Sequence, residues 1–220
     1  MEIKKYVLDM KPNNQPLSGT LFVQLQKDIL CGKLKPGQKL TEQDLCMEYN
    51  VSRTPVREAL RQLEMDGLVE NIPNRGAFVV GFSDQDLMDI YELRKAYEIQ
   101  AVRWAIERIS DDEFEALEET FEFMEFYTIK NDIEKMLNIN TGFHQIIYSA
   151  AKNRMLQHVL SSYQIYIKHS SRNSVYQDDY LDSVLAEHKA IFEAFKSKDP
   201  EAGAAAMAIH MDKSKLRHNE

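Results

Sequence analysis

This sequence of 220 residues lacks the features that mark secreted, membrane-spanning and disulfide-stabilised proteins. Its only two cysteines, Cys31 and Cys46, lie in half-apolar helical contexts without metal-site spacing, so we expect them to be reduced packing residues. No run approaches the ~18 consecutive apolar residues of a membrane span. No apolar stretch follows the N-terminal lysines, so no secretion signal is expected. We therefore expect a cytoplasmic protein without a membrane partner.

An overall excess of positive charge is also missing. The formal net charge is −8. Residues 1–80 carry 11 Lys and Arg against 10 Asp and Glu, whereas residues 81–220 carry 16 against 25. Contacts with nucleic acid must therefore come from local basic patches in the first part, and affinity should fall as salt rises.

The most informative stretch is residues 52–60, Ser-Arg-Thr-Pro-Val-Arg-Glu-Ala-Leu. Ser52 can cap a helix whose first turn and a half carries Arg53, Thr54 and Arg57. The same helix has an apolar side formed by Val56, Ala59, Leu60 and Leu63. This pattern places cationic, hydrogen-bonding side chains at an exposed helix start, where a duplex can be read in its major groove.

The surrounding residues predict a winged helix-turn-helix. Thr41 can cap a short helix before the reading helix, and Gly67 can end the reading helix. Two extended runs follow, residues 68–72 and 77–82, separated by a tight turn with a basic tip at residues 73–76. Two helices and then a two-stranded wing is the order of that fold.

Residues 17–82 closely resemble the winged helix of GntR-type transcriptional regulators. The matching stretches are residues 30–37, 52–60, 63–69 and 74–76. The resemblance implies that Arg53, Thr54 and Arg57 touch base edges or phosphates, and that Arg75 and Gly76 of the wing enter the minor groove.

Three further positions are open between DNA contact and an ordinary surface role. They are Gln43, which stands where some relatives carry a basic contact residue, Arg61 and Lys39. Surface arginines are commonly solvated or paired, so Arg57 has Glu58 as an alternative partner. Arg61 likewise has Glu64 or Asp66 nearby.

The chain after residue 82 is predicted to be helical throughout. Apolar periodicity and capping signals indicate helices at residues 83–109, 110–127, 132–151, 155–170, 179–197 and 200–216, with a polar loop at 171–178. Short links favour an antiparallel bundle. The expected architecture is mainly α, with an N-terminal arm (1–16), the winged helix-turn-helix (17–82), an all-helical domain (83–215) and a frayed tail (216–220).

Polar residues at apolar helix faces suggest a metal site in this bundle. Asn140 and His144 lie four apart on one face, and His188 and His210 lie on the last two helices. Buried imidazoles need partners, and a divalent metal gathering three of them is one solution. From spacing alone, the alternative of ordinary core histidines with one hydrogen bond each is favoured.

Residues 83–215 resemble the all-helical FCD effector-binding domain of the FadR branch of the GntR family. The matching stretches are residues 91–98, 140–144, 187–188 and 210. Many relatives hold a metal with an aspartate and three histidines, which correspond to His144, His188 and His210. Asn140 stands where the aspartate commonly sits, so the site should be weaker or completed by an anionic effector. Zinc is expected, with nickel or manganese as alternatives.

The resemblance also implies a small organic acid as effector. Arg94 is the candidate to hold its carboxylate, although a helix pair with Glu98 is equally open. Tyr97, Tyr148 and Tyr163 are candidate lining residues, although most aromatic side chains at helical spacing are core residues.

The sequence thus predicts a bacterial-type, ligand-responsive transcription factor. Two subunits would bind a palindromic operator, with repression expected first and activation left open. Two alternatives are a metal-dependent hydrolase with Glu187 as general base, and a constitutive DNA-binding protein with a vestigial pocket.

Overall fold

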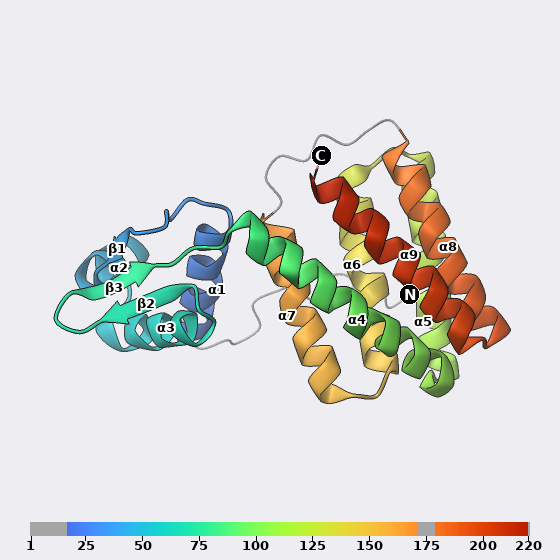
Figure 1. The fold of residues 1–220 in the computed structure, drawn as a ribbon, viewed down its shortest axis with the longest axis horizontal. Coiled ribbons are helices and arrows are strands. Elements are labelled where there is room, and N and C mark those ends of the chain that lie inside the picture. Colours follow the sequence, from blue (N-terminus) through green and yellow to red (C-terminus); the bar gives the residue numbers. More distant parts are fainter. Residues whose placement is uncertain (1–16, 171–178, 220) are drawn as a thin grey trace. The chain divides into compact units, whose positions relative to one another are not determined.

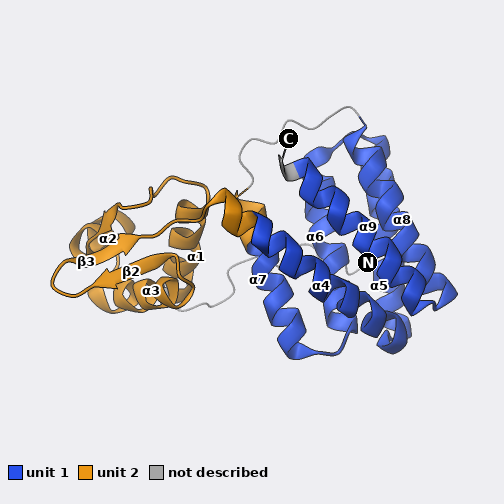
Figure 2. Ribbon diagram, viewed as in Figure 1, with its two compact units in different colours: residues 1–10, 88–165, 173–220 blue, residues 11–87, 166–172 orange. Residues whose placement is uncertain are grey.

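A computed structural model describes residues 17–170 and 179–219, which form two compact units (Figure 2). Of the described residues, 17–87 and 166–170 form one unit, and 88–165 and 179–219 form the other. The predicted N-terminal arm (1–16) and the predicted loop at 171–178 lie outside the described residues. Within the described ranges, no helix combines the length and apolar character needed to cross a bilayer.

The first unit is a winged helix-turn-helix (Figure 1). Its described elements are α1 (Leu17–Leu30), β1 (Lys39–Leu40), α2 (Glu42–Tyr49), α3 (Arg53–Met65), β2 (Val69–Ile72) and β3 (Gly76–Val79). The two-stranded wing is present, but its sheet gains a third strand and has the antiparallel order β1-β3-β2. β1 is too short to show an alternating pattern, and it is fixed by pairing Lys39 with Phe78.

Local signals position α2 and α3 within this unit. The Thr41 side chain accepts a hydrogen bond from the Asp44 backbone N–H, as the capping pattern predicts. Ser52 occupies the N-cap of α3 in an extended conformation but makes no side-chain cap hydrogen bond. Gly67 follows the helix with a φ of 73°, in the left-handed region that favours glycine.

The two cysteines differ from each other in their surroundings. Cys46 packs against the core of this unit, as expected. Cys31 is exposed and is not a packing residue, because it lies just beyond the last buried turn of α1.

The second unit is all-helical in its described part, as predicted. Its helices are α4 (Asp84–Arg108), α5 (Asp111–Ile129), α6 (Ile133–Ala150), α7 (Arg154–Ser170), α8 (Tyr180–Ser197) and α9 (Pro200–Asn219). Ser110 and Glu113 form a complete capping box at the start of α5. The Asp199 carboxylate accepts from two backbone N–H groups at the start of α9, so Pro200 begins that helix.

The prediction of a frayed tail at 216–220 is corrected for its described part, because α9 continues to Asn219; Glu220 lies outside the described residues. Polar contacts hold this end of the helix. Lys215 pairs with Glu92, and Arg217 pairs with Glu187.

The end of α7 packs differently from the rest of the bundle. Residues 166–170 belong to the winged-helix unit, where the Tyr166 ring lies 5.3 Å from the Phe82 ring, centroid to centroid.

Candidate DNA-reading face and candidate metal centre

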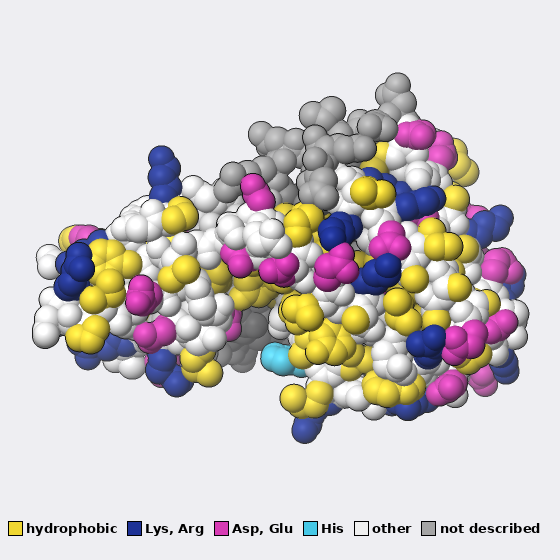
Figure 3. Space-filling view, in the orientation of Figure 1, with side chains coloured by type: hydrophobic (Ala, Val, Ile, Leu, Met, Phe, Trp, Pro, Cys, Tyr) yellow, Lys and Arg dark blue, Asp and Glu magenta, His cyan; other side chains and the backbone are white. Residues whose placement is uncertain are grey.

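The start of α3 presents the side chains that the sequence analysis singled out. Arg53, Thr54 and Arg57 are exposed. The opposite side of the helix is buried through Val56, Ala59, Leu60 and Leu63. Burial of one face fixes the helix on its unit, so the polar face is held outward in a defined orientation. On the face shown in Figure 3, Lys and Arg side chains of this unit are interspersed with Asp and Glu, consistent with its near-zero charge.

Arg57 and Arg61 of α3 do not pair with the carboxylates that lie near them in the sequence. Arg57 Nε donates to Glu42 Oε1 of α2 at 2.7 Å, whereas Glu58 was the partner considered. This hydrogen bond, together with the charge of Arg57, lowers the pKa of Glu42 although partial burial opposes it. Arg61 Nη1 lies 3.8 Å from Met65 Sδ. Gln43 is exposed on α2, the helix that also carries Glu42.

The wing tip gathers a second cationic group. Arg75 Cζ lies 5.8 Å from the centre of the Phe78 ring, and Lys39 Nζ lies 6.0 Å from it. Gly76 has a φ of 102°, and a Cβ atom there would lie 3.2 Å from Lys39 Cε. The short strand β1 therefore brings Lys39 to the wing, a position that sequence spacing alone did not indicate.

The three histidines predicted as ligands meet inside the helical unit. His144 (α6), His188 (α8) and His210 (α9) are all buried, and one ring nitrogen of each lies within 4.8 Å of the others. His144 Nε2 lies 3.2 Å from His210 Nε2. Side chains from three different helices thus converge on one point in the core.

Each of these imidazoles has its Nδ1 atom beside a hydrogen-bond acceptor. His144 Nδ1 lies 3.3 Å from Glu98 Oε2, and His210 Nδ1 lies 3.0 Å from Glu187 Oε2. His188 Nδ1 lies 2.8 Å from the Val184 carbonyl oxygen. These acceptors favour a proton on every Nδ1, which leaves a lone pair on every Nε2.

Two buried polar atoms of the helical unit have no hydrogen-bond partner among the described residues. His188 Nε2 is buried without a hydrogen-bond partner among the described residues, and so is Asn140 Oδ1. Burial, reinforced by the neighbouring histidines, lowers the pKa of His188 well below its usual value. Burial also lowers the pKa of His210 to about 4, against the opposing effect of Glu187. An unpaired polar atom is costly in the interior, so His188 Nε2 and Asn140 Oδ1 are candidate ligands for a cation.

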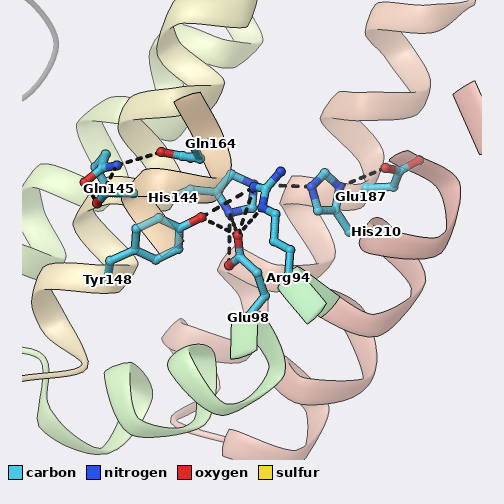
Figure 4. A network of polar contacts seen from close by, with 9 residues as sticks. Arg94, Glu98, His144, Gln145, Tyr148, Gln164, Glu187 and His210 are labelled. Carbon is cyan, nitrogen blue, oxygen red and sulfur yellow. Dashed lines mark hydrogen bonds and ion pairs between the residues drawn. The ribbon is translucent and has the colours of Figure 1, made fainter. Parts of the chain in front are cut away.

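A second layer of polar groups surrounds the histidines (Figure 4). Glu98 is fully buried and accepts from Tyr148 Oη and, at 3.0 Å, from Arg94 Nε. Burial would raise the pKa of Glu98, but His144, Arg94 and Tyr148 together lower it. On the other side, Glu187 contacts His210 and Arg217. Carboxylates that orient metal-binding imidazoles are a recurring second layer of metal sites.

The candidate effector residues separate into two places. Arg94 and Tyr148 join the buried network through Glu98, so the helix pair considered for Arg94 is present. Tyr97 is 42% exposed and lies beside Tyr163, with 6.3 Å between ring centroids. Tyr97 directly precedes Glu98, and successive residues of a helix point about 100° apart, so its exposed ring lies away from the buried network around Glu98.

Three residues of the second layer are not among the site residues that the sequence predicts. Glu98 is expected only as a helix partner of Arg94, and Arg217 lies in the predicted tail. Glu187 was considered only as a general base, but its carboxylate lies on the Nδ1 side of His210, away from the convergent Nε2 atoms. The hydrolase interpretation therefore lacks its base.

Comparison with known proteins agrees with both units. Residues 17–79 match the family described as bacterial regulatory proteins, gntR family, and residues 89–213 match the FCD domain. The HTH-type transcriptional regulator YdhC of Bacillus subtilis is 33% identical over 202 residues, covering 90% of this chain and 89% of YdhC. The galactonate operon transcriptional repressor of Escherichia coli is 27% identical over 223 residues, covering 91% and 96% of the two chains.

A solved structure shows the same fold. Escherichia coli McbR/YncC aligns with a TM-score of 0.73 and 23% sequence identity, covering 93% of this chain and 98% of that one.

The relatives are transcriptional regulators and not enzymes. From its two domains and these likenesses, the chain belongs to the GntR family of bacterial regulatory proteins, as a DNA-binding transcriptional regulator with an FCD domain.

Proposed function

We propose that this regulator is a homodimeric repressor whose α3 helices read the two halves of a pseudo-palindromic operator. Arg53, Thr54 and Arg57 contact base edges and phosphates in the major groove. Arg75 and Gly76 carry the wing into the minor groove, and Gln43 and Arg61 flank the reading helix. The observation that carries this proposal is the outward polar start of α3 above its buried apolar face.

The FCD domain is proposed to hold a divalent metal, most favourably zinc. His144, His188 and His210 would supply Nε2 atoms, and Asn140 would supply Oδ1. Support comes from the hydrogen-bonded Nδ1 atoms and from the two buried atoms without partners, which suit a cation. Imidazole ligands also suit nickel, and the amide oxygen is compatible with manganese. When bound, the metal supplies open coordination positions to a ligand.

We propose a small carboxylic acid as the ligand. Three imidazoles and an amide carry no charge, whereas Glu98 and Glu187 are paired with Arg94 and Arg217. A dication here would therefore leave uncompensated positive charge in the interior, which a carboxylate would neutralise. Arg94 and Tyr148 would shape the site through Glu98, and the name of the galactonate-operon relative fits regulation of acid metabolism. The exposed Tyr97 would contribute only if it lines the entrance.

Regulation would follow as a population shift. An acid that binds one arrangement of the dimer better than the other changes operator affinity by that difference in affinity. The same linkage predicts that operator DNA changes the affinity for the acid.

Gel-shift titration with fragments from the flanking genomic region tests the DNA-reading assignment. We expect one fragment to bind tightly, with binding lost in Arg53→Ala and Arg57→Ala. Operator binding that is indifferent to both substitutions would rule out this reading face.

Thermal shift across a panel of carboxylic acids tests the effector assignment separately. A ligand that binds the folded protein raises the melting temperature. If no acid does so with zinc present, a constitutive DNA-binding protein is the better description.

A further inference from the structure

The end of α9 is held to its unit by polar contacts. Met211 is buried, but residues 212–217 are all exposed or half-buried, and Leu216 is 62% exposed. Residues 212–219 form roughly the last two turns of the helix. Because residues 212–217 bury little apolar surface, the docking of this segment depends on the ion pairs and hydrogen bonds of a few side chains.

Arg217 makes the most extensive of these contacts. Its Nη2 atom donates to Ser183 Oγ at 3.0 Å and also to Glu187 Oε1. Its Nη1 atom donates to Glu187 Oε2 at 3.2 Å. The guanidinium carbon lies 5.7 Å from the centre of the Tyr180 ring. A two-pronged contact of this kind fixes the carboxylate as well as the arginine.

Glu187 connects this contact to the histidine cluster. The residue is 5% exposed, and its Oε2 atom accepts from His210 Nδ1 at 3.0 Å while also facing Arg217. Ser183 Oγ and Lys213 Nζ lie 3.2 and 3.5 Å from Oε1. One buried carboxylate therefore shares its two oxygens between a metal-ligand candidate and the last turns of α9.

The other second-layer carboxylate, Glu98, is not connected to the surface in this way. Glu98 and its partner Arg94 lie on the same helix and are both buried, with side chains 0% and 8% exposed. The Arg217 side chain is 22% exposed, so the contact through Glu187 leads from the core to the surface.

We propose that the last two turns of α9 are coupled to metal occupancy through the chain of contacts Arg217–Glu187–His210. This inference rests on the proposed metal centre. A metal on His210 Nε2 polarises the imidazole, makes Nδ1–H a stronger donor and so holds Glu187 in the orientation that Arg217 grips. By linkage, loss of the Arg217 contact must weaken metal binding. The factor is the same as the one by which bound metal strengthens the docking of this segment. Glu187 and Arg217 are positioning residues in this scheme.

Zinc titration with a competing chelator, combined with hydrogen exchange of residues 212–219, tests the coupling in the full chain. Arg217→Met removes the contact with Glu187. Lys215→Met is the matched control, because Lys215 lies in the same turns but pairs with Glu92 instead. We expect Glu187→Gln to weaken zinc roughly 10- to 100-fold, as second-layer substitutions do. Arg217→Met should weaken it about 3- to 10-fold, since it acts one contact further out.

The exchange experiment separates coupling from general fraying. Zinc should slow exchange of residues 212–219 in the wild type and in Lys215→Met, but not in Arg217→Met. Arg217→Lys should restore part of both effects. Imidazole nitrogen NMR of His210, recorded with and without zinc, gives a readout independent of helix docking: its Nδ1–H signal should change in Arg217→Met and not in Lys215→Met.

Three results would overturn the inference. The first is wild-type zinc affinity and zinc-dependent protection in Arg217→Met. The second is an equal loss of zinc affinity in Arg217→Met and Lys215→Met, which would indicate general fraying. The third is a wild-type protein that binds no zinc, nickel or manganese, which would remove the proposed metal centre as well, whereas the first two leave that centre intact.

Discussion

Removal of Arg57 should weaken operator binding and reduce its dependence on salt. Arg57 is 64% exposed on α3, and its structural partner is Glu42 at 2.7 Å. An exposed pair of this kind contributes little to folding, so Arg57→Ala should melt close to the wild-type temperature. A loss of DNA binding would then report the contact with the duplex and not unfolding.

In the proposed dimer, the size of the effect follows from two copies of Arg57. One lost contact is expected to cost about 5- to 150-fold in affinity, so two should cost at least roughly 25-fold. If both copies of Arg57 contact phosphates, the slope of log K against log salt falls by about 1.8. When salt rises from 50 to 200 mM, the fold-loss of affinity should then be about 12 times smaller for the variant than for the wild type.

Fluorescence anisotropy with an operator duplex across a salt series measures both quantities. Arg103→Ala is the matched control, because Arg103 forms an exposed pair with Glu201 in the helical unit at the same kind of distance, 2.8 Å. Glu42→Gln should strengthen binding, since it frees Arg57 and removes a negative charge near the phosphates. Wild-type affinity and wild-type salt slope in Arg57→Ala would refute the reasoning.

Three further predictions concern the helical unit. Asn140→Asp should raise zinc affinity at least about tenfold and make it less dependent on added carboxylate, because an internal anion replaces the external one; chelator competition with and without acid measures this, and an unchanged affinity would contradict the placement of Asn140. Chelation of a metal present at 100 times its Kd should cost about 3 kcal/mol of stability, or roughly 5–10 °C in melting temperature, and a protein unaffected by chelator would count against the centre. Glu113→Gln should destabilise the protein slightly at pH 7, because Ser110 and Lys152 favour the ionised form of Glu113 and lower its pKa against the opposing effect of burial. That stability is present above the unfolded pKa of about 4.5 and is lost as pH falls through the lower folded value, so melting curves of the two proteins should converge in acid; a difference that persists there would contradict it.

The sequence was most informative where local chemistry decides the structure. Capping signals at Thr41, Ser110 and Asp199 marked helix starts, because side-chain acceptors there satisfy unpaired backbone N–H groups. The order of helices and wing strands followed from such signals. The convergence of three histidines could be proposed only with the help of a family resemblance, since spacing along the chain does not say which helices are neighbours.

The remaining features depend on contacts between distant segments. β1 has no pattern of its own and exists because residues 39–40 pair with β3. The polar end of α9 looks like a frayed tail until Glu187, far away in the sequence, is placed beside Arg217. Tyr97 directly precedes Glu98 along the chain, but successive residues of a helix point about 100° apart, so Tyr97 lies outside the buried network. Tertiary pairing of this kind cannot be read from local periodicity.

The third strand of the small sheet also affects the proposed insertion of the wing into DNA. An isolated two-stranded hairpin is only marginally stable in water, and its tip samples many conformations. Here β3 is bordered by strands on both sides, so the wing hairpin that carries Arg75 is already stiffened in the absence of DNA. Insertion into a narrow groove should then cost little conformational freedom, and the two residues of β1, which are not part of the reading helix, become a determinant of association strength.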